Sequence, residues 1–325
     1  MKVLFVASGN SSSFDVAPFI KAQAISIAKQ KIEIDFFPIM GKGVFGYLKG
    51  AIQLRRFVKK NNYNLIHAHY TLSGWSAVLA LTGKPIILSL MGSDAYGSYI
   101  GVNKISFLSR FHILITYLIQ PFVRAIISKS AHINSFVYLK NKSYIIPNGI
   151  DTTTFFEIKE QIEPSHNLEQ NKHNILFLGN KENVRKNYKL LEDAISLINI
   201  DINLIAPYPI THNMVFYYLK TVNLIVVPSL MEGSPNVVKE AMACNCPVVA
   251  TNVGDVEWLF GNEPGHFITT FEPEDVAEKI KLALQFSKEK GRTNGRQRII
   301  KLGLDSETIA KQIIEIYKSV VKDEQ

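Results

Sequence analysis

The chain of 325 residues is long for one domain and has the composition of a folded protein. Hydrophobic residues make up 47% and charged residues 20%, which excludes a disordered chain. The formal charge of +8 is unevenly spread: residues 1–150 carry 17 Lys and Arg against 4 Asp and Glu (+13), and the remainder carries 19 against 24 (−5). We therefore expect two domains with different partners.

The N-terminus, MKVLFVASG, predicts a buried first strand. Its apolar run at residues 3–6 is too short for a signal peptide, so we expect a cytoplasmic protein. The two cysteines of the chain, Cys244 and Cys246, lie in an apolar stretch. No further Cys and no local group of His completes a metal site with them, and we expect both to be reduced and structural.

Short apolar runs alternate with helical patterns along the first half. Helices are expected at residues 18–29, 43–60, 73–81 and within the apolar segment 107–127. Strands are expected at residues 3–6, 32–37, 65–69, 85–90, 131–134 and 144–146. This alternation is typical of a parallel sheet with helices on both faces, so the first half is predicted to be an α/β domain.

The second half repeats the pattern after a polar stretch, residues 157–173, that is expected to be a long loop. Strands are expected at residues 175–178, 202–205, 224–227 and 248–250, and helices at residues 236–244 and 306–321. This pattern predicts a second α/β domain, again with parallel strands.

The basic first half suggests an anionic membrane surface as partner. Residues 43–60 mix apolar and aromatic side chains with cations, a composition typical of interfacial helices; the cations at the end of this segment are Arg55, Arg56, Lys59 and Lys60. Segment 107–127 is interrupted by polar residues and does not predict a spanning helix. The alternative is that both segments are ordinary packing helices. Nucleic acid is a further anionic partner, but no motif for it is present.

The most informative stretch is residues 227–258, VPSLMEGSPNVVKEAMACNCPVVATNVGDVEW. An apolar strand precedes Glu232, a loop of small residues follows it, and a helix begins near Asn236. This order places backbone N–H groups at the positive end of a helix dipole, which is an anion site. Glu240 follows Asn236 by about one helical turn and can face the same site. Backbone amides for a diphosphate and carboxylates for hydroxyls suit a sugar nucleotide.

The segment EGSPNVVKEAMACNCPVVAT closely resembles the signature of retaining glycosyltransferases of family 4, of the bacterial surface-polysaccharide type. MKVLFVASG, IIPNGIDTTTF and ILFLGNKENVRKNYKLLEDAISLI resemble further segments of that family in the same order, so the resemblance covers nearly the whole chain. It implies the α/β GT-B fold, in which two Rossmann-like, doubly wound domains face a cleft. Residues 1–150 would bind the acceptor, residues 151–305 the donor, and a helix within residues 306–325 would pack back on the first domain.

The resemblance also implies roles in the donor domain. Glu232 would orient the donor sugar, and Glu240 would bind the ribose. The loop expected to meet the sugar and the diphosphate through its backbone comprises Gly233, Ser234, Pro235, Asn236 and Val237. No protein nucleophile is implied, because retaining members of the family are thought to react on one face of the sugar, with the donor phosphate helping to take the acceptor proton.

A second loop, which begins at Gly179, is implied to reach the donor phosphates. Lys186 fits the family's lysine there and is the second residue, after Glu232, to which we assign a catalytic role. Asn180 stands where the family usually has Arg. Phosphate charge would therefore rest on Lys186, helped by Lys181 or Arg185.

The first domain contributes candidate cleft contacts. The turn of Gly9 and Asn10 follows the first strand, where ligands approach parallel sheets. It does not have the G-x-G-x-x-G pattern of a dinucleotide site. His69 ends a strand and is a candidate cleft contact. With His67 it makes a pair that has no third ligand nearby, so no metal is expected.

The stretch LMGSD departs from the family, which often has His-Gly-Ser-Asp there. Met91 replaces the histidine, so an imidazole contact is absent at that point or is supplied elsewhere. Asp94 is expected to meet an acceptor hydroxyl instead.

The resemblance implies an enzyme of the EC 2.4 class that moves a sugar from a nucleotide-diphosphate sugar to a hydroxyl of a glycan or lipid-linked acceptor, with retention of configuration. The expected setting is cell-surface polysaccharide or glycolipid synthesis, peripheral on the inner face of the plasma membrane. No metal and no other cofactor is expected. Two alternatives stay open: another GT-B sugar-nucleotide enzyme, such as an epimerase or phosphorylase, and a basic nucleic-acid-binding protein.

Overall fold

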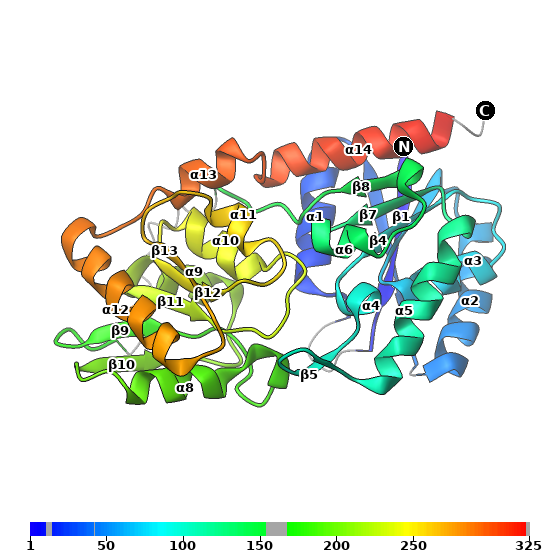
Figure 1. The fold of residues 1–325 in the computed structure, drawn as a ribbon. Coiled ribbons are helices and arrows are strands. Elements are labelled where there is room, and N and C mark those ends of the chain that lie inside the picture. The colour runs from blue at the N-terminus through cyan, green and yellow to red at the C-terminus, as the bar shows by residue number, and fades with distance from the viewer. Residues whose placement is uncertain (11–14, 42, 154–167, 323–325) are drawn as a thin grey trace. The chain divides into compact units, whose positions relative to one another are not determined.

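The computed structural model describes residues 1–10, 15–41, 43–153 and 168–322, and the chain divides into two compact units (Figure 1). The first unit comprises Met1–Ser98, Ser106–Gly149 and Ser306–Gln325, and the second comprises Tyr99–Ile105 and Ile150–Asp305. Most of the polar stretch 157–173 lies outside the described residues, so its expected loop stays a prediction.

The first unit is built on a six-stranded parallel sheet with the order β2-β1-β3-β4-β7-β8. Its strands are β1 (Lys2–Ser8), β2 (Glu33–Ile39), β3 (Leu65–His69), β4 (Ile86–Leu90), β7 (Ala125–Ser128) and β8 (Ser143–Ile145). Its longer helices are α1 (Pro18–Ala28), α2 (Gly43–Lys60), α3 (Thr71–Leu79), α5 (Phe107–Ile119) and α14 (Ser306–Lys322). Helix α3 packs against both α2 and α5, whereas α1 packs against α14 (Figure 1). The central strands β3 and β4 are buried along their whole length and are mostly apolar, as expected for strands with helices on both faces.

A buried polar contact fixes α14 to this sheet. The hydroxyl of Tyr317 lies 2.6 Å from Nδ1 of His67, and Nε2 of His67 lies 2.8 Å from the hydroxyl of Ser89. All three residues are buried. Buried polar atoms need partners, and this chain of contacts satisfies both ring nitrogens of His67. His67 is thus a structural residue in the middle of a buried strand.

The helix expected within residues 107–127 is present, but the strand expected at residues 131–134 is not. The apolar helix ends at Ile119, because Pro121 lacks the N–H group that would continue it, and a short 3₁₀ turn, η1 (Gln120–Phe122), follows. The strand is β7 (Ala125–Ser128), and residues 131–134, expected as a strand, form helix α6 (Ala131–Ser135). The hydroxyl of Ser130 accepts a hydrogen bond from Ile133 N at 3.3 Å and caps that helix.

The second unit has a five-stranded parallel sheet with the order β10-β9-β11-β12-β13. Its strands are β9 (His173–Leu176), β10 (Ile202–Ile205), β11 (Leu224–Val227), β12 (Val248–Thr251) and β13 (His266–Thr269). Its helices are α8 (Tyr188–Ser196), α9 (His212–Thr221), α10 (Asn236–Ala243), α11 (Val256–Phe260), α12 (Pro273–Lys290) and α13 (Gly295–Lys301). Strand β13 was not predicted. Its four residues begin with a histidine and make a weak apolar signal.

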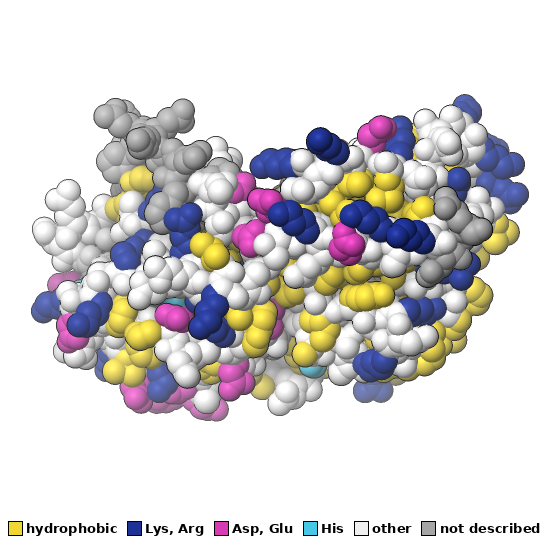
Figure 2. Space-filling model, turned by 90° about the horizontal axis from the view of Figure 1, so that it is seen from above, with side chains coloured by type: hydrophobic (Ala, Val, Ile, Leu, Met, Phe, Trp, Pro, Cys, Tyr) yellow, Lys and Arg dark blue, Asp and Glu magenta, His cyan; other side chains and the backbone are white. Residues whose placement is uncertain are grey.

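A small hairpin from the first half of the sequence belongs to the second unit. Its strands are β5 (Tyr99–Gly101) and β6 (Lys104–Ile105), and β5 lies against the 3₁₀ turn η3 (Val184–Lys186). No helix within the described part of the chain is both long and apolar enough to cross a membrane. Figure 2 shows lysine and arginine side chains interspersed with apolar ones on one face of the molecule.

Candidate active site

The candidate site lies in the second unit, where the chain leaves the carboxyl ends of β9 and β11. After β11 the chain runs through residues 228–235 and enters α10 at Asn236, one of the predicted boundaries. Two bonds fix this loop: Thr251 Oγ1 donates to the Ser229 carbonyl at 2.6 Å, and Leu230 N donates to the Arg185 carbonyl at 2.9 Å. The second bond joins the two loops that the sequence assigned to the donor.

Glu232 is the centre of an ion cluster between these loops. Its Oε1 lies 2.8 Å from Lys186 Nζ and accepts a hydrogen bond from Ser229 Oγ at 3.0 Å, and its Oε2 lies 2.5 Å from Arg185 Nη1. The residue is only 9% exposed. Burial raises the pKa of Glu232, but the charges of Lys186 and Arg185 outweigh burial and hold the pKa below its usual value. Glu232 is therefore a carboxylate at neutral pH.

Short-range contacts shape the cationic loop. The side chain of Asn183 accepts a hydrogen bond from Arg185 N at 3.1 Å and starts the turn that carries Arg185 and Lys186. Asn180, at the position where the family usually has Arg, accepts from Glu182 N at 3.0 Å and so stabilises the same loop, which begins after Gly179. Lys181 Nζ lies 4.7 Å from the centre of the Tyr188 ring. The structure thus brings two of the three predicted cations to Glu232 and places Lys181 on an aromatic ring.

The loop Gly233–Pro235 packs against a turn that includes Gly254. Gly254 has a φ of +64°, and a Cβ atom on it would lie 2.5 Å from the Gly233 carbonyl oxygen and 2.8 Å from that of Glu232. Only glycine fits such a close approach without displacing the loop. The turn therefore supports the backbone of residues 233–237, to which the family resemblance assigned diphosphate binding.

A charged pair lies behind this loop. Lys239 on α10 is fully buried, and burial lowers its pKa to about 8, while the charges of Asp255 and Glu240 act in the opposite direction. Burial raises the pKa of Asp255, and Lys239 and Ser234 oppose that effect. Neither Lys239 nor Asp255 was singled out from the sequence, because a lysine one residue before a helical glutamate normally lies in solvent.

Glu240 faces a histidine that the sequence analysis also missed. Its Oε1 lies 3.3 Å from Nε2 of His212, the first residue of α9. The hydrogen bond to Glu240 raises the pKa of His212 above its usual value, against the effect of burial. The two residues are 28 positions apart, and only the packing of α9 against α10 brings them together.

The arrangement gathers two cations and two carboxylates around the start of α10. Two cations and the start of α10 supply positive potential, and two glutamates supply hydrogen-bond acceptors. Across the residues that the structure describes, no group of three or more His, Cys, Asp and Glu side chains is placed to hold a metal ion. The positive potential of Lys186, Arg185 and the start of α10 is suited to bind an anion and to stabilise developing negative charge.

The candidates of the first unit lie at the carboxyl ends of their strands. Asn10 exchanges two hydrogen bonds of 2.8 Å with the backbone of Gly41, and Gly9 N donates to the Ile39 carbonyl at 2.9 Å. His69 is buried against Phe5, and burial holds its pKa well below its usual value, so the ring is neutral. The predicted cleft contacts of Gly9, Asn10 and His69 stay predictions.

Asp94 is buried and already bonded. Its carboxylate accepts hydrogen bonds from backbone N–H groups of Gly92 at 2.8 Å, Met91 at 3.0 Å and Thr71 at 3.1 Å. Burial raises its pKa, and these bonds oppose the rise. The residue lies in the first turn of the short helix α4 (Ser93–Tyr96) and fixes the turn around Met91 through these bonds. Its contact with an acceptor stays a prediction, now beside this structural role.

Comparisons with known proteins assign both halves of the chain. Residues 6–130 match a family described as glycosyl transferase 4-like, and residues 168–285 match glycosyl transferases group 1. Each half of the chain thus matches a glycosyltransferase domain. The prediction of a glycosyltransferase enzyme is thereby confirmed.

Two curated relatives are each 27% identical to the chain. One is a teichuronic acid biosynthesis glycosyltransferase, TuaC, of Bacillus subtilis, aligned over 67% of this chain and 60% of the relative. The other is an uncharacterized glycosyltransferase, MJ1178, of Methanocaldococcus jannaschii, aligned over 72% of this chain and 69% of the relative. The chain thus spans about three fifths of the length of the first relative.

Solved structures resemble the chain along its whole length. Sucrose-phosphate synthase from Thermosynechococcus elongatus has a TM-score of 0.78 at 17% identity and covers 99% of both chains. Anabaena Alr3699/HepE in complex with UDP has a TM-score of 0.73 at 15% identity and covers 98% of this chain and 100% of its own. These likenesses confirm the predicted GT-B fold.

Proposed function

We propose that this protein transfers a glycosyl group from a nucleotide-diphosphate sugar to a hydroxyl of a glycan or lipid-linked acceptor, with retention of anomeric configuration. The observation that carries the proposal is the ion cluster of Glu232, Lys186 and Arg185 at the start of α10. It combines an anion site with a carboxylate that can accept hydrogen bonds from sugar hydroxyls. The related structures in complex with UDP and UDP-glucose support a nucleotide-sugar donor.

The donor would lie along the start of α10. Backbone N–H groups of residues 233–237 and the cations of Lys186 and Arg185 would bind its diphosphate. Glu232 would orient the sugar, and Glu240, one helical turn further, would accept hydrogen bonds from the ribose. The two carboxylates would thus hold the sugar and the ribose, and the cations would hold the diphosphate between them.

The reaction needs stabilisation of a departing diphosphate. The bond from the anomeric carbon to the phosphate oxygen breaks, and a bond to the acceptor oxygen forms on the same face of the sugar. The acceptor proton passes to a donor phosphate oxygen. Lys186 and the loop amides would stabilise the negative charge that grows on the diphosphate, which is electrostatic work that fixed donors perform well. The proposal needs no metal ion.

We propose a lipid-linked acceptor at an anionic membrane surface on the cytoplasmic side. The first unit exposes large apolar side chains on two helices that both pack against α3: Val44, Phe45, Leu48 and Ile52 on α2, and Phe107, Phe111, Leu114 and Leu118 on α5. Helix α2 also carries the cations Arg55, Arg56, Lys59 and Lys60. A helix that combines apolar side chains with cations is typical of a membrane surface. The name of the Bacillus subtilis relative supports a role in cell-surface polysaccharide synthesis.

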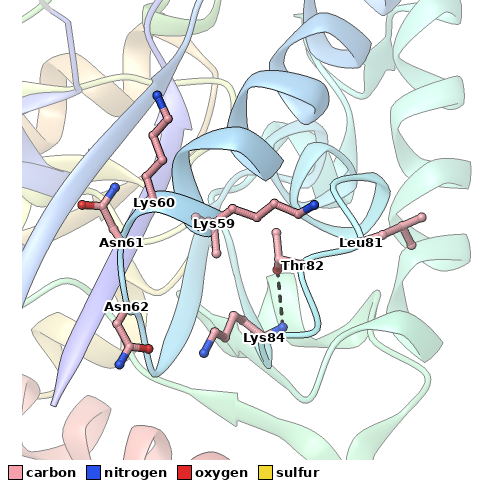
Figure 3. Close-up of a pocket in the computed structure, with 8 residues that line it drawn as sticks. Lys59, Lys60, Asn61, Asn62, Leu81, Thr82 and Lys84 are labelled. Carbon is pink, nitrogen blue, oxygen red and sulfur yellow. Dashed lines mark hydrogen bonds between the residues drawn. The ribbon is translucent and has the colours of Figure 1, made fainter.

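A hollow at the end of α2 adds to this cationic surface (Figure 3). It has a volume of about 450 Å³ and is lined by Val58, Lys59, Lys60, Asn61, Asn62, Leu81, Thr82 and Lys84. Three lysines and no acidic residue line it, and the turn that carries Leu81 exposes that side chain. Such a lining suits lipid phosphates, which attract surface cations.

Calorimetry against UDP-, GDP-, ADP- and CMP-sugars tests the donor, followed by turnover with lipid-linked and free glycan acceptors and by NMR of the product anomer. We expect binding of one nucleotide family, acceptor-dependent turnover in the presence of EDTA, and a product with the donor's anomeric configuration. Donor conversion without an acceptor would instead indicate an epimerase or phosphorylase. DNA binding without any sugar-nucleotide binding would overturn the proposal.

A further inference from the structure

His212 lies at the open side of the carboxylate to which we assign ribose binding. Its Nε2 is 3.3 Å from Glu240 Oε1, and its ring packs edge to face on Phe216 at 4.4 Å between centroids. The His212 side chain is 62% exposed, whereas that of Glu240 is 16% exposed. One side of the His212 ring thus packs on Phe216, and the exposed histidine contacts the mostly buried Glu240 from its solvent side.

The contact uses one oxygen of Glu240 and leaves the other for a ligand. A carboxylate without a fixed partner can rotate, so a hydrogen bond to Oε1 orients Oε2. Among the described residues, Glu240 is the one whose charge shifts the pKa of His212. Its neighbour Lys239 is fully buried and is influenced by the charge of Asp255, and Lys220 lies in the last turn of α9.

We infer that His212 is a positioning residue for the donor: it holds Glu240 in the orientation that binds the ribose and makes donor affinity depend on pH. This inference rests on the proposed function. Protonated His212 gives a charge-assisted bond to Glu240 and adds positive charge near the diphosphate, and both effects weaken when the ring loses its proton. Because Glu240 favours the protonated ring, this loss occurs above the ordinary pKa of histidine.

Calorimetry from pH 6 to pH 8.5 tests the inference, with the nucleoside diphosphate selected by the sugar-nucleotide panel (UDP, GDP or ADP) and its 2′-deoxy and 3′-deoxy forms. Wild type should lose affinity roughly threefold to tenfold as pH rises through this range. His212→Gln cannot gain a charge, so its affinity should not change with pH and should equal the weak affinity that wild type has at high pH. His212→Ala should in addition lose part of the preference for the ribonucleotide. His112→Gln, a matched change in the first unit, should behave as wild type.

The outcomes separate the inference from the proposed function. If the His212 variants keep the wild-type affinity, pH profile and ribose preference while Glu240→Ala loses that preference, the inference is overturned and the ribose role of Glu240 stands. If Glu240→Ala is also unchanged, or if wild type binds no nucleotide, the inference is overturned together with the assigned site. Melting curves of each variant exclude misfolding as the cause of a loss.

Discussion

Lys186 Nζ lies 2.8 Å from Glu232 Oε1, so the cation assigned to the donor phosphates is paired with the carboxylate assigned to the donor sugar. Glu232 is almost fully buried, and a buried carboxylate needs such compensation. Arg185 holds the other oxygen, so Lys186 can turn to a phosphate without leaving Glu232 unpaired. The pair thus keeps both side chains in place for the donor.

Lys186→Ala should lower kcat on the order of 10²–10³-fold and affect donor affinity less, because charge on the diphosphate grows as the glycosidic bond breaks. Steady-state kinetics and donor calorimetry measure the two effects. Lys181→Ala, which removes a nearby cation from the Tyr188 ring, is the matched control and should retain turnover. Near-normal turnover in Lys186→Ala, with a loss in Lys181→Ala or Arg185→Ala, would show that our assignment of the loop is wrong. EDTA should leave activity intact in every case.

Glu240→Ala should weaken nucleotide-sugar binding by about 1.5–3 kcal/mol, the range for a lost hydrogen bond to a charged group. Its carboxylate lies one turn into α10, bonded to His212 and largely screened from solvent. Calorimetry measures the loss. Glu257→Ala, in the exposed first turn of α11, serves as the control and should bind the donor as wild type does. Unchanged affinity in folded Glu240→Ala would remove its ribose role.

Much of the fold follows from local pattern. The bounds of β3, β10 and β11 were predicted correctly from short, mostly apolar segments. Only β11 is a continuous apolar run, as expected for a strand covered on both faces. The error at residues 131–134 arose because only a short turn separates the apolar β7 from the apolar helix α5, and periodicity cannot distinguish the two elements. Pro121, which lies between the two apolar runs, was the signal that could have separated the helix from the strand.

Less of the site could be predicted. The pairing of Glu232 with Lys186 joins residues 46 positions apart that were each assigned through a family motif. No motif and no periodicity indicated His212, the buried Lys239 or its electrostatic interaction with Asp255. Their roles depend on packing between α9, α10 and the turn before α11, and a sequence pattern does not contain those contacts.

Gly254→Ala should destabilise the protein and weaken donor binding. The residue has a φ of +64°, and an added Cβ would meet the Gly233 carbonyl oxygen at 2.5 Å, so strain and steric displacement of the donor loop add to roughly 1–3 kcal/mol. Gly291→Ala is a matched control, because its φ is +76° and a Cβ there meets nothing within 4 Å. Chemical denaturation and donor calorimetry compare the two. Equal stability and equal affinity in both variants would contradict support of the loop by Gly254.

Lys239 should make stability rise with pH. Its pKa is lowered to about 8 in the folded chain, against about 10.4 in an unfolded one, so between these values the unfolded chain binds a proton that the folded chain lacks. From pH 7.5 to pH 10 the free energy of unfolding of wild type should gain about 2 kcal/mol relative to Lys239→Met. Urea denaturation at several pH values measures this difference.

Two further variants keep the Lys239 test sound. Lys239→Met leaves Asp255 without its cation, so the double variant K239M/D255N provides a second reference. Lys281→Met, an exposed change on α12, is the control for replacing a lysine by methionine as such. A wild-type advantage over both Lys239 variants that stays constant from pH 7.5 to pH 10 would contradict a depressed lysine pKa.

Replacing Arg55, Arg56, Lys59 and Lys60 with Ser should release the protein from anionic vesicles and leave donor binding unchanged. Near-surface cations contribute about 1 kcal/mol each, and exposed apolar side chains of α2 and α5 add to them. Flotation with anionic and with neutral phosphatidylcholine vesicles measures binding, and high salt should partly mimic the replacement by screening. The matched control replaces four exposed cations of the second unit: Lys281, Lys288, Lys290 and Lys301. It should float as wild type does. If wild type ignores anionic vesicles at low salt, the membrane surface is not a partner, and a soluble glycan or small molecule becomes the expected acceptor.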